Sequence, residues 1–199
     1  MPNGTIHPQA IVESEHIGVG TRIWAFAHVL AHVRIGSNCN IGDHSFIETG
    51  VTIGNNVTIK NAAMLPEGIT IQDDVFVGPH VKFSNDRFPR SPRMKLLGDH
   101  YAEKENWLVE TVVEQGASIG VGATILPGLR LGRYCMVGGG AVVTRDVPPF
   151  ALVVGTPAKR VADVCRLGHK LSGAFQDATC KTCGESPLDR AREYVSTSV

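Results

Sequence analysis

The residues best suited to chemistry stand at Asn85 and Asp86, in the segment "FSND", where a regular apolar pattern stops. An amide orients a substrate through hydrogen bonds, and a carboxylate accepts a proton or holds a hydroxyl group. His80, in "VGPHVKF", is the nearest imidazole in the sequence and is the candidate general base. The alternative for His80 is a solvated edge histidine.

A long segment without the pattern follows, from Ser84 to Val112. Loops beyond about 12–15 residues in a compact domain are usually functional or disordered. This one begins with cations, of which Arg87 and Arg90 are the first two, and cations over a crevice suit a phosphorylated substrate. Alternatively, the segment is a flap that clasps a neighbouring subunit and its arginines are solvated.

The elements that position these residues come from a repeat of six. Stepping by six from Ile11 to Phe83 meets thirteen consecutive apolar residues, and the pattern resumes at Val113. A small or β-branched residue stands four positions after most of them, and glycine often stands one position after. This period fits neither an α-helix nor a simple amphipathic strand. It predicts short strands joined by corners into a solenoid, with both apolar sets pointing inward and glycines taking strained corner dihedrals.

These hexads resemble those of the left-handed parallel β-helix acyltransferases, the hexapeptide-repeat family, over roughly residues 5–162. The resemblance implies an all-β fold of about six triangular coils and a homotrimer with active sites between neighbouring prisms. It divides the chain into a β-helix domain, residues 1–162 with the excursion at 84–112, and a C-terminal tail, residues 163–199. A non-catalytic β-helix scaffold is the alternative.

A closer resemblance rests on "TRIWAFAHV", "VTIGNNVTIKN", "FSND" followed by "PRS", and "VVGTPAKRV". These segments are similar to the branch that N-acetylates the 3-amino group of nucleotide-linked dideoxy sugars, UDP- or dTDP-linked. The resemblance implies that Asn85 lies beside the sugar amine at the trimer interface, and it marks Lys60 and Asn61 as substrate-binding. His28 fits the branch pattern on an outward corner, where interface packing and substrate contact remain equal alternatives.

The last coils, from Gly116 to Pro148, are rich in glycine and alanine. The resemblance implies that the pantetheine arm of acetyl-CoA lies along them, and the expected contacts are Gly120, Ala123, Gly138 and Ala141. The resemblance also implies that the basic residues Lys159 and Arg160 bind the phosphates of CoA. The simpler alternative is that small residues fit any corner of the repeat.

The tail holds three cysteines that do not follow the repeat. Cys180 and Cys183 form half of a metal knuckle in "CKTCG", and "CRLGH" places Cys165 and His169 four residues apart. Together they predict a Cys₃His zinc site. A decayed zinc ribbon or reduced free thiols are the alternatives. Cys39 and Cys135 fall on inward positions of the repeat and are expected to be core thiols.

Composition sets the remaining expectations. Nineteen basic and nineteen acidic residues give a formal net charge of zero, which argues against a nucleic-acid partner. No apolar run is long enough to span a membrane, and the first residues do not resemble a signal peptide, so we expect a cytoplasmic protein. The predicted function is acetyl transfer from acetyl-CoA to the amine of a nucleotide sugar in surface-polysaccharide synthesis. Transfer to a hydroxyl, or of another acyl group, is the alternative.

Overall fold

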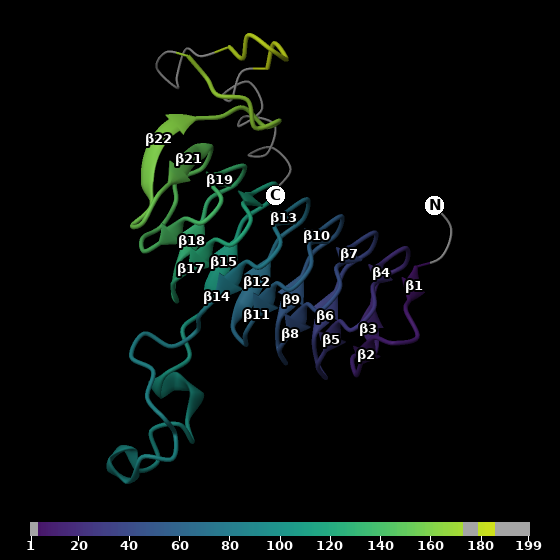
Figure 1. Ribbon diagram of the computed structural model, residues 1–199, viewed down its shortest axis with the longest axis vertical. Helices are drawn as coiled ribbons and strands as arrows, with labels where there is room; N and C mark the ends of the chain where they lie inside the picture. The colour runs from purple at the N-terminus through teal and green to yellow at the C-terminus, as the bar shows by residue number, and fades with distance from the viewer. Residues whose placement is uncertain (1–3, 173–178, 186–199) are drawn as a thin grey trace, which may run out of the picture.

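The computed structural model describes residues 4–172 and 179–185. The chain coils around one long axis, and its short strands stack along that axis to form a three-sided prism (Figure 1). The strands form three parallel stacks, which we call sheets A, B and C. Sheet A contains β1 (Thr5–Ile6), β4 (Arg22–Ile23), β7 (Asn40–Ile41), β10 (Thr58–Ile59), β13 (Phe76–Val77), β16 (Ser118–Ile119), β19 (Met136–Val137), β21 (Ala151–Val154) and β22 (Lys159–Asp163). Sheet B contains β2 (Ile11–Val12), β5 (His28–Val29), β8 (Phe46–Ile47), β11 (Met64–Leu65), β14 (Lys82–Phe83), β17 (Thr124–Ile125) and β20 (Val142–Val143). Sheet C contains β3 (His16–Ile17), β6 (Arg34–Ile35), β9 (Thr52–Ile53), β12 (Ile69–Ile71), β15 (Thr111–Val113) and β18 (Arg130–Leu131).

Successive coils pair in register, and from β1 to β20 the paired strands are three apart along the chain, whereas β19 also pairs with β21. Thr58 of β10 pairs with Asn40 of β7 on one side and Phe76 of β13 on the other, so one coil takes 18 residues in the middle of the prism, while the spacing is 17 at Thr5 and 16 at Met136. The spacing of 18 is three hexads, and it confirms the predicted parallel β-helix. The strands β1 to β18 make six complete coils, and β19, β20 and β21 continue the stack.

The core is a column of the two predicted inward sets. Ile59 and Leu65 have no exposed surface, and neither do the small residues Val57 and Ala63 that precede them by two positions. Cys39 and Cys135 are buried in the same column, as expected, and burial raises the pKa of Cys135 to about 12. These two thiols are therefore packing groups and not nucleophiles.

The corner glycines serve close approach, which corrects the expectation that they take strained dihedrals. Positive φ occurs two positions later in the corner, where ordinary residues such as His32 and Asn56 adopt it as well as glycines. The glycine that follows the apolar residue instead lies against the next coil. A Cβ on Gly36 would stand 2.5 Å from the carbonyl oxygen of Gly54 and 2.6 Å from its carbon. Stacking distance, and not backbone conformation, selects glycine there.

Replacing Gly36 by Ala is expected to destabilise the β-helix by about 3 kcal/mol, the upper end of the usual cost of overpacking. Both clashing atoms are backbone, so neither can rotate away. The free energy of unfolding in urea measures the effect, and Ser37→Ala in the same corner is the control, expected within about 0.5 kcal/mol of the parent. Equal stability of the two variants would contradict this account.

One long arm, residues 86–108, leaves the prism between β14 and β15 and projects away from it (Figure 1). It contains two short 3₁₀ turns, η1 (Lys95–Leu97) and η2 (Lys104–Asn106). The amide of Val109 donates to the carbonyl of Asn85 at 2.8 Å, so the two ends of the arm meet. The chain rejoins sheet C at Thr111, slightly earlier than the predicted boundary at Val112, because Thr111 already pairs with Ile69.

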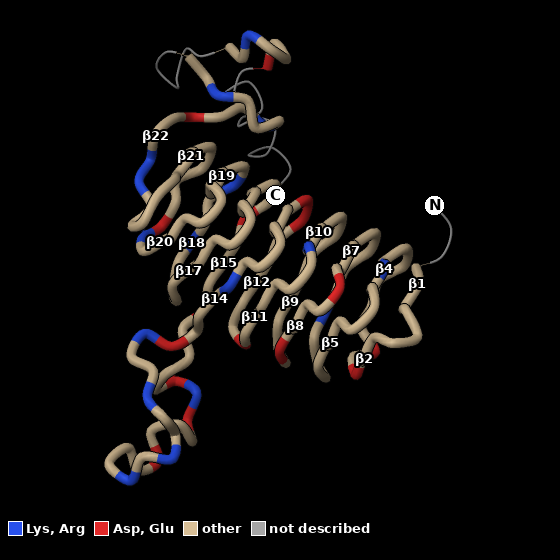
Figure 2. Tube along the Cα trace, viewed as in Figure 1, with Lys and Arg blue, Asp and Glu red and all other residues tan. Residues whose placement is uncertain are grey.

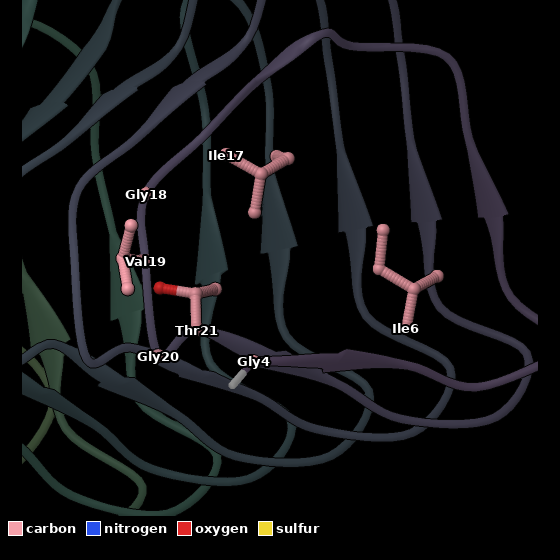
Figure 3. Close-up of a pocket in the computed structure, with 7 residues that line it drawn as sticks. All are labelled: Gly4, Ile6, Ile17, Gly18, Val19, Gly20 and Thr21. Carbon is pink, nitrogen blue, oxygen red and sulfur yellow. The ribbon is translucent and has the colours of Figure 1, made fainter. Parts of the chain in front are cut away.

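The two ends of the prism differ. At the C-terminal end, β22 folds back antiparallel on β21 and leads into the tail. At the N-terminal end, the first coil is open, and Ile6 and Ile17 line a cavity of about 330 Å³ with neighbouring glycines (Figure 3). Ile11 was predicted to be the first inward residue of the repeat, and this is wrong: Ile11 is mostly exposed because it pairs with outward-facing His28, and Val12 takes the inward position beside Val29. The described part of the chain has no helix of the length and hydrophobicity needed to cross a bilayer.

Candidate active site

The predicted site residues lie along the two edges of sheet B. The edge between sheets A and B carries Lys60, Asn61 and His80, which come between a strand of sheet A and the following strand of sheet B. The edge between sheets B and C carries Asn85 and Asp86 at the start of the arm. Within one chain, strand β14 therefore separates His80 from Asn85. The structure does not bring the candidate base and the candidate amide together in a single prism.

Asn85 is fixed at the neck of the arm, which is the point where Asn85 and Val109 meet. Its side-chain amide nitrogen donates to the carbonyl of Glu67 at 3.1 Å, and its own carbonyl accepts from Val109. Glu67 also pairs with the Lys104 ammonium group of the arm. Among the described residues, no hydrogen bond reaches the Oδ1 atom of Asn85. The neck thus holds one end of the amide and leaves its accepting oxygen available to a ligand.

Asp86 is engaged within the arm. Its Oδ1 accepts from the amide of Phe88 at 2.8 Å, and its Oδ2 accepts from the hydroxyl of Tyr101 at 2.9 Å. The same hydroxyl accepts from the amide of Arg90 at 2.9 Å. These contacts fold the arm back on its own start. They support a positioning role for Asp86, whose prediction as a proton acceptor stays a prediction.

His28 lies on the outer face of sheet B, on β5. Its Nε2 is 3.1 Å from Oε1 of Glu13, and its ring meets the edge of Phe46 with centroids 5.5 Å apart. The hydrogen bond with His28, with a further one from the amide of Ala31, lowers the pKa of the Glu13 carboxyl. The pair is a half-exposed carboxylate–histidine unit. It stands three strands from β14 in the sheet order β5-β8-β11-β14, so it lies about 14 Å from the neck.

His80 occupies an exposed corner with φ of 58°, and its amide donates to the carbonyl of Asn61 at 2.9 Å. Lys60 and Asn61 are both exposed on the preceding coil of the same edge. The three therefore form one local group. This grouping agrees with the predicted substrate-binding role of Lys60 and Asn61 but does not test it.

The two arginines of the arm that were predicted to bind substrate lie at its base and along its length. Arg87 lies over the B–C edge, since a Cβ on Gly128 would stand 2.7 Å from its Nη2. Arg90 is exposed, and its Nη1 donates to the carbonyl of Pro89 at 2.9 Å. Cations and carboxylates both occur along the arm (Figure 2). The cations gather in its first half, as the sequence indicates.

The residues predicted to bind acetyl-CoA fall into two groups. Gly120 and Gly138 stack on the A–B edge and keep some exposed surface. Ala123 and Ala141 have none, because both occupy the inward position of the repeat, and this removes them as ligand contacts. Lys159 and Arg160 are exposed on β22, where Arg160 also pairs with Asp163.

Three residues with a part in this site were not predicted from the sequence: Glu67, Tyr101 and Glu13. Each acts through a partner 15 or more positions away, and only the coil spacing of 18 could have suggested two of those pairs. Glu67 precedes Asn85 by 18 residues, and Glu13 precedes Ala31 by 18. Tyr101 contacts Asp86 through the arm, where no repeat applies.

The tail brings its four predicted ligands together. One ligand atom from each of Cys165, His169, Cys180 and Cys183 lies within 4.8 Å of all the others.

The chain also has a cavity of about 320 Å³ beside sheet C, lined by Thr52, Gly54, Thr70, Ile71, Gln72, Asp73 and Gln115. Neither this cavity nor the one at the N-terminal end contains Asn85 or His80. In a single chain, His80 is exposed and Asn85 is half-exposed.

The prism of hexads and the polar groups on its edges define a class, the hexapeptide-repeat transferases. Two family profiles match: "Bacterial transferase hexapeptide (six repeats)" over residues 16–49 and "Hexapeptide repeat of succinyl-transferase" over residues 110–145. The chain is 47% identical over 180 residues to the dTDP-3-amino-3,6-dideoxy-alpha-D-galactopyranose 3-N-acetyltransferase of Aneurinibacillus thermoaerophilus. The match covers 90% of this chain and 88% of the relative. The chain therefore belongs to the left-handed β-helix acyltransferases of this family, in the branch of nucleotide-linked amino-sugar 3-N-acetyltransferases.

Two solved structures share the fold at low identity. A point mutant of AntD, an N-acyltransferase from Bacillus cereus solved with dTDP and coenzyme A, is 16% identical with a TM-score of 0.58. The match covers 81% of each chain. The acetyltransferase domain of PglB from Neisseria gonorrhoeae, in complex with acetyl coenzyme A, is 21% identical with a TM-score of 0.52. That match covers 80% of this chain and 58% of the other. These likenesses concern the fold.

Proposed function

We propose that this chain transfers the acetyl group of acetyl-CoA to the 3-amino group of a dTDP-linked 3-amino-3,6-dideoxyhexose. The observation that carries the proposal is the 47% identity, over nearly the full length of both chains, to an enzyme named for that reaction. The structure adds an available amide oxygen on Asn85 at the neck of a partly basic arm. The reaction would take place in the cytoplasm, where acetyl-CoA and nucleotide sugars are made, and would serve surface-polysaccharide synthesis.

In the proposed reaction, the neutral sugar amine attacks the thioester carbonyl, a C–N bond forms, and the C–S bond breaks. Asn85 Oδ1 accepts a hydrogen bond from the amine and aims its lone pair at the carbonyl. Backbone amides of the glycine-rich A–B edge are suited to stabilise the oxyanion. The amine loses its extra proton to His80 or to the departing CoA thiolate. Orientation supplies most of the rate acceleration, because amines are good nucleophiles towards thioesters.

We propose a homotrimer as the active form. The two halves of the site occupy opposite edges of sheet B, so His80 meets Asn85 only if the A–B edge of one copy faces the B–C edge of another. The A–B edge and the adjoining face of sheet B carry large exposed apolar side chains, Trp24, Phe26 and Met64, each at least 40% exposed in the single chain. Patches of this kind commonly mark interfaces. The active site would then lie in the seam between two prisms.

The test is acetyl-CoA turnover with matched acceptors, measured by release of the free CoA thiol. We expect turnover with a dTDP-linked 3-amino-3,6-dideoxyhexose and none with the corresponding 3-hydroxy sugar. Adding the UDP-linked sugar and the 4-amino sugar to the panel shows which nucleotide and which amine position the enzyme prefers. Preference for the hydroxyl would replace the proposal by O-acetyl transfer. The absence of CoA binding, with no turnover of any acceptor, would reduce the protein to a scaffold.

A further inference from the structure

The cluster of Cys165, His169, Cys180 and Cys183 is assembled from two segments that are separate in the sequence. Cys165 and Cys180 are each 1% exposed, and Cys183 and His169 are half-buried. All five cysteines of the chain are unbridged. Three thiols and an imidazole that converge in this way are a typical donor set for a metal ion.

Three of the six separations between the donor atoms match those of a tetrahedron, and the other three are within 4.8 Å. His169 Nδ1 lies 3.5 Å from Cys165 Sγ and 3.7 Å from Cys180 Sγ, and Cys183 Sγ lies 3.7 Å from Cys165 Sγ. Ligands on Zn–S bonds of about 2.3 Å and a Zn–N bond of about 2.0–2.1 Å stand about 3.5–3.8 Å apart at tetrahedral angles. The four atoms are therefore spaced to coordinate one Zn²⁺ with little rearrangement.

Two turns of similar design present the ligands. In the first, the amide of Gly168 donates to the carbonyl of Cys165 and the amide of Cys165 donates to the carbonyl of His169, both at 2.9 Å. In the second, the amide of Gly184 donates to the carbonyl of Cys180 at 2.8 Å. Gly168 and Gly184 have φ of 82° and 73°, which only glycine adopts readily. Each turn thus places two ligand side chains so that they face the centre of the cluster.

The first turn is fastened to the prism. The amide of Val164 donates to the carbonyl of Phe150 at 2.9 Å, and the guanidinium of Arg166 lies over the ring of Tyr134, 4.9 Å from its centroid. Arg166 also donates to the hydroxyl of Tyr134 at 3.1 Å. The first pair of ligands is therefore held by the last coils, whether or not a metal is bound.

The second turn presents its two ligands from the segment 179–185. Cys180 is buried and Cys183 is half-buried, although most of their neighbours in this segment are exposed. The donor atoms of both lie within 4.8 Å of those of Cys165 and His169, so the cluster is a point of contact between the two segments. A metal ion would join the two turns there.

We propose that these four residues bind one Zn²⁺ in a closed structural site that ties the segment 179–185 to the last coils of the β-helix. Thiolate-rich tetrahedral coordination favours zinc over magnesium or calcium, which prefer oxygen ligands. Four protein ligands leave no position for substrate, so the ion takes no part in acetyl transfer. The site joins two distant segments much as a disulfide would, but without oxidation of the thiols.

The test is the metal content of the full-length protein, purified with reductant and without chelator. Mass spectrometry of the metals is expected to find about one zinc per chain. Cys183→Ser and His169→Gln are each expected to lose bound zinc during dialysis. Cys39→Ala is the matched control, because it removes a buried thiol from the core and leaves the cluster intact. Hydrogen exchange of residues 179–185 should speed up in the two ligand variants and not in the control.

Three results would overturn the proposal. They are a protein free of zinc that takes up none on titration with Zn²⁺ in the reduced state, a Cys183→Ser variant that retains the full zinc content, and iron in place of zinc. Acetyl transfer is measured on the same samples. Unchanged turnover in a zinc-free variant supports a structural site, whereas a large fall in its kcat at an unchanged trimer content would contradict it. Zinc content does not depend on whether the proposed acceptor is correct.

Discussion

Replacing Asn85 by Ala is expected to lower kcat for the amino sugar by about 10²-fold, the loss that a small misplacement of a reacting group produces. The change removes the amide oxygen that would orient the amine and the donor that ties the neck to Glu67. Neither loss reaches the core, because Asn85 is half-exposed and lies on an edge of the prism. Steady-state turnover with saturating acetyl-CoA measures the effect, and the melting temperature should move little.

Asn55→Ala is the matched control. Asn55 is also a corner asparagine whose side chain bonds to a neighbouring coil, but it lies on the edge between sheets C and A. Its replacement is expected to leave kcat unchanged. If Asn85→Ala keeps parental kcat and KM, the assignment of the seam as the active site fails. A rise in KM for the sugar alone would limit Asn85 to binding.

Excising the arm is expected to lower turnover by at least about 10²-fold while the β-helix still folds. Since the carbonyl of Asn85 and the amide of Val109 are already hydrogen-bonded, a Gly-Ser pair can replace residues 86–108 as the centre of a β-turn. The deletion removes Arg87, Arg90 and the Asp86–Tyr101 contact together. The acceptor would lose the arginine side chains proposed to contact it, and the start of the arm would lose the ion pair between Lys104 and Glu67.

The arm also contains groups that lack a partner in one chain. Phe88 is 81% exposed and Leu96 is 92% exposed, and the buried indole nitrogen of Trp107 has no acceptor among the described residues. Sedimentation of the excised protein therefore accompanies the kinetic assay. A stable trimer with lost activity assigns the arm to the substrate, and loss of the trimer assigns it to subunit contact. Full activity would show that the arm is dispensable.

A substitution restricted to the charges refines this result. Arg87→Gln with Arg90→Gln keeps the apolar part of the arm, so it is the control for packing. A rise in KM for the nucleotide sugar, with an unchanged trimer, is the outcome expected if the guanidinium groups meet phosphates.

The fold could be predicted from the sequence because each hexad carries its own pattern. Ile59 and Ala63 are inward in the structure for the same reason that they stood out in the sequence, namely a fixed period of six. The role of the glycines was harder to predict. Gly36 looks like a turn residue, and only the stacked backbone of Gly54 shows that close contact selects it.

The candidate site was less predictable, because its residues are local in sequence but not in space. His80 and Asn85 are five residues apart, yet one strand of the prism places them on different edges. Ala123 and Ala141 share the glycine-rich stretch with Gly120 and Gly138, but the inward position of the repeat withdraws them from any ligand. The contact of Tyr101 with Asp86 depends on the path of the arm, which no period describes.

The in-register pairing of coils limits how the length of this chain can change. In the middle of the prism, Thr58 meets Asn40 and Phe76 at a spacing of 18, so gain or loss of one whole coil there preserves the pairings. A change of one residue must instead be absorbed at the corner where it falls, or it turns inward side chains outward. The first coil is adjusted in this way, because Thr5 pairs with Arg22 and Val12 pairs with Val29 at a spacing of 17. The arm is exempt, because its ends meet at Asn85 and Val109 and its length never enters the register. Insertions and deletions should therefore be confined to corners or whole coils in the prism, whereas they can be of any size in the arm, the part proposed to face the acceptor.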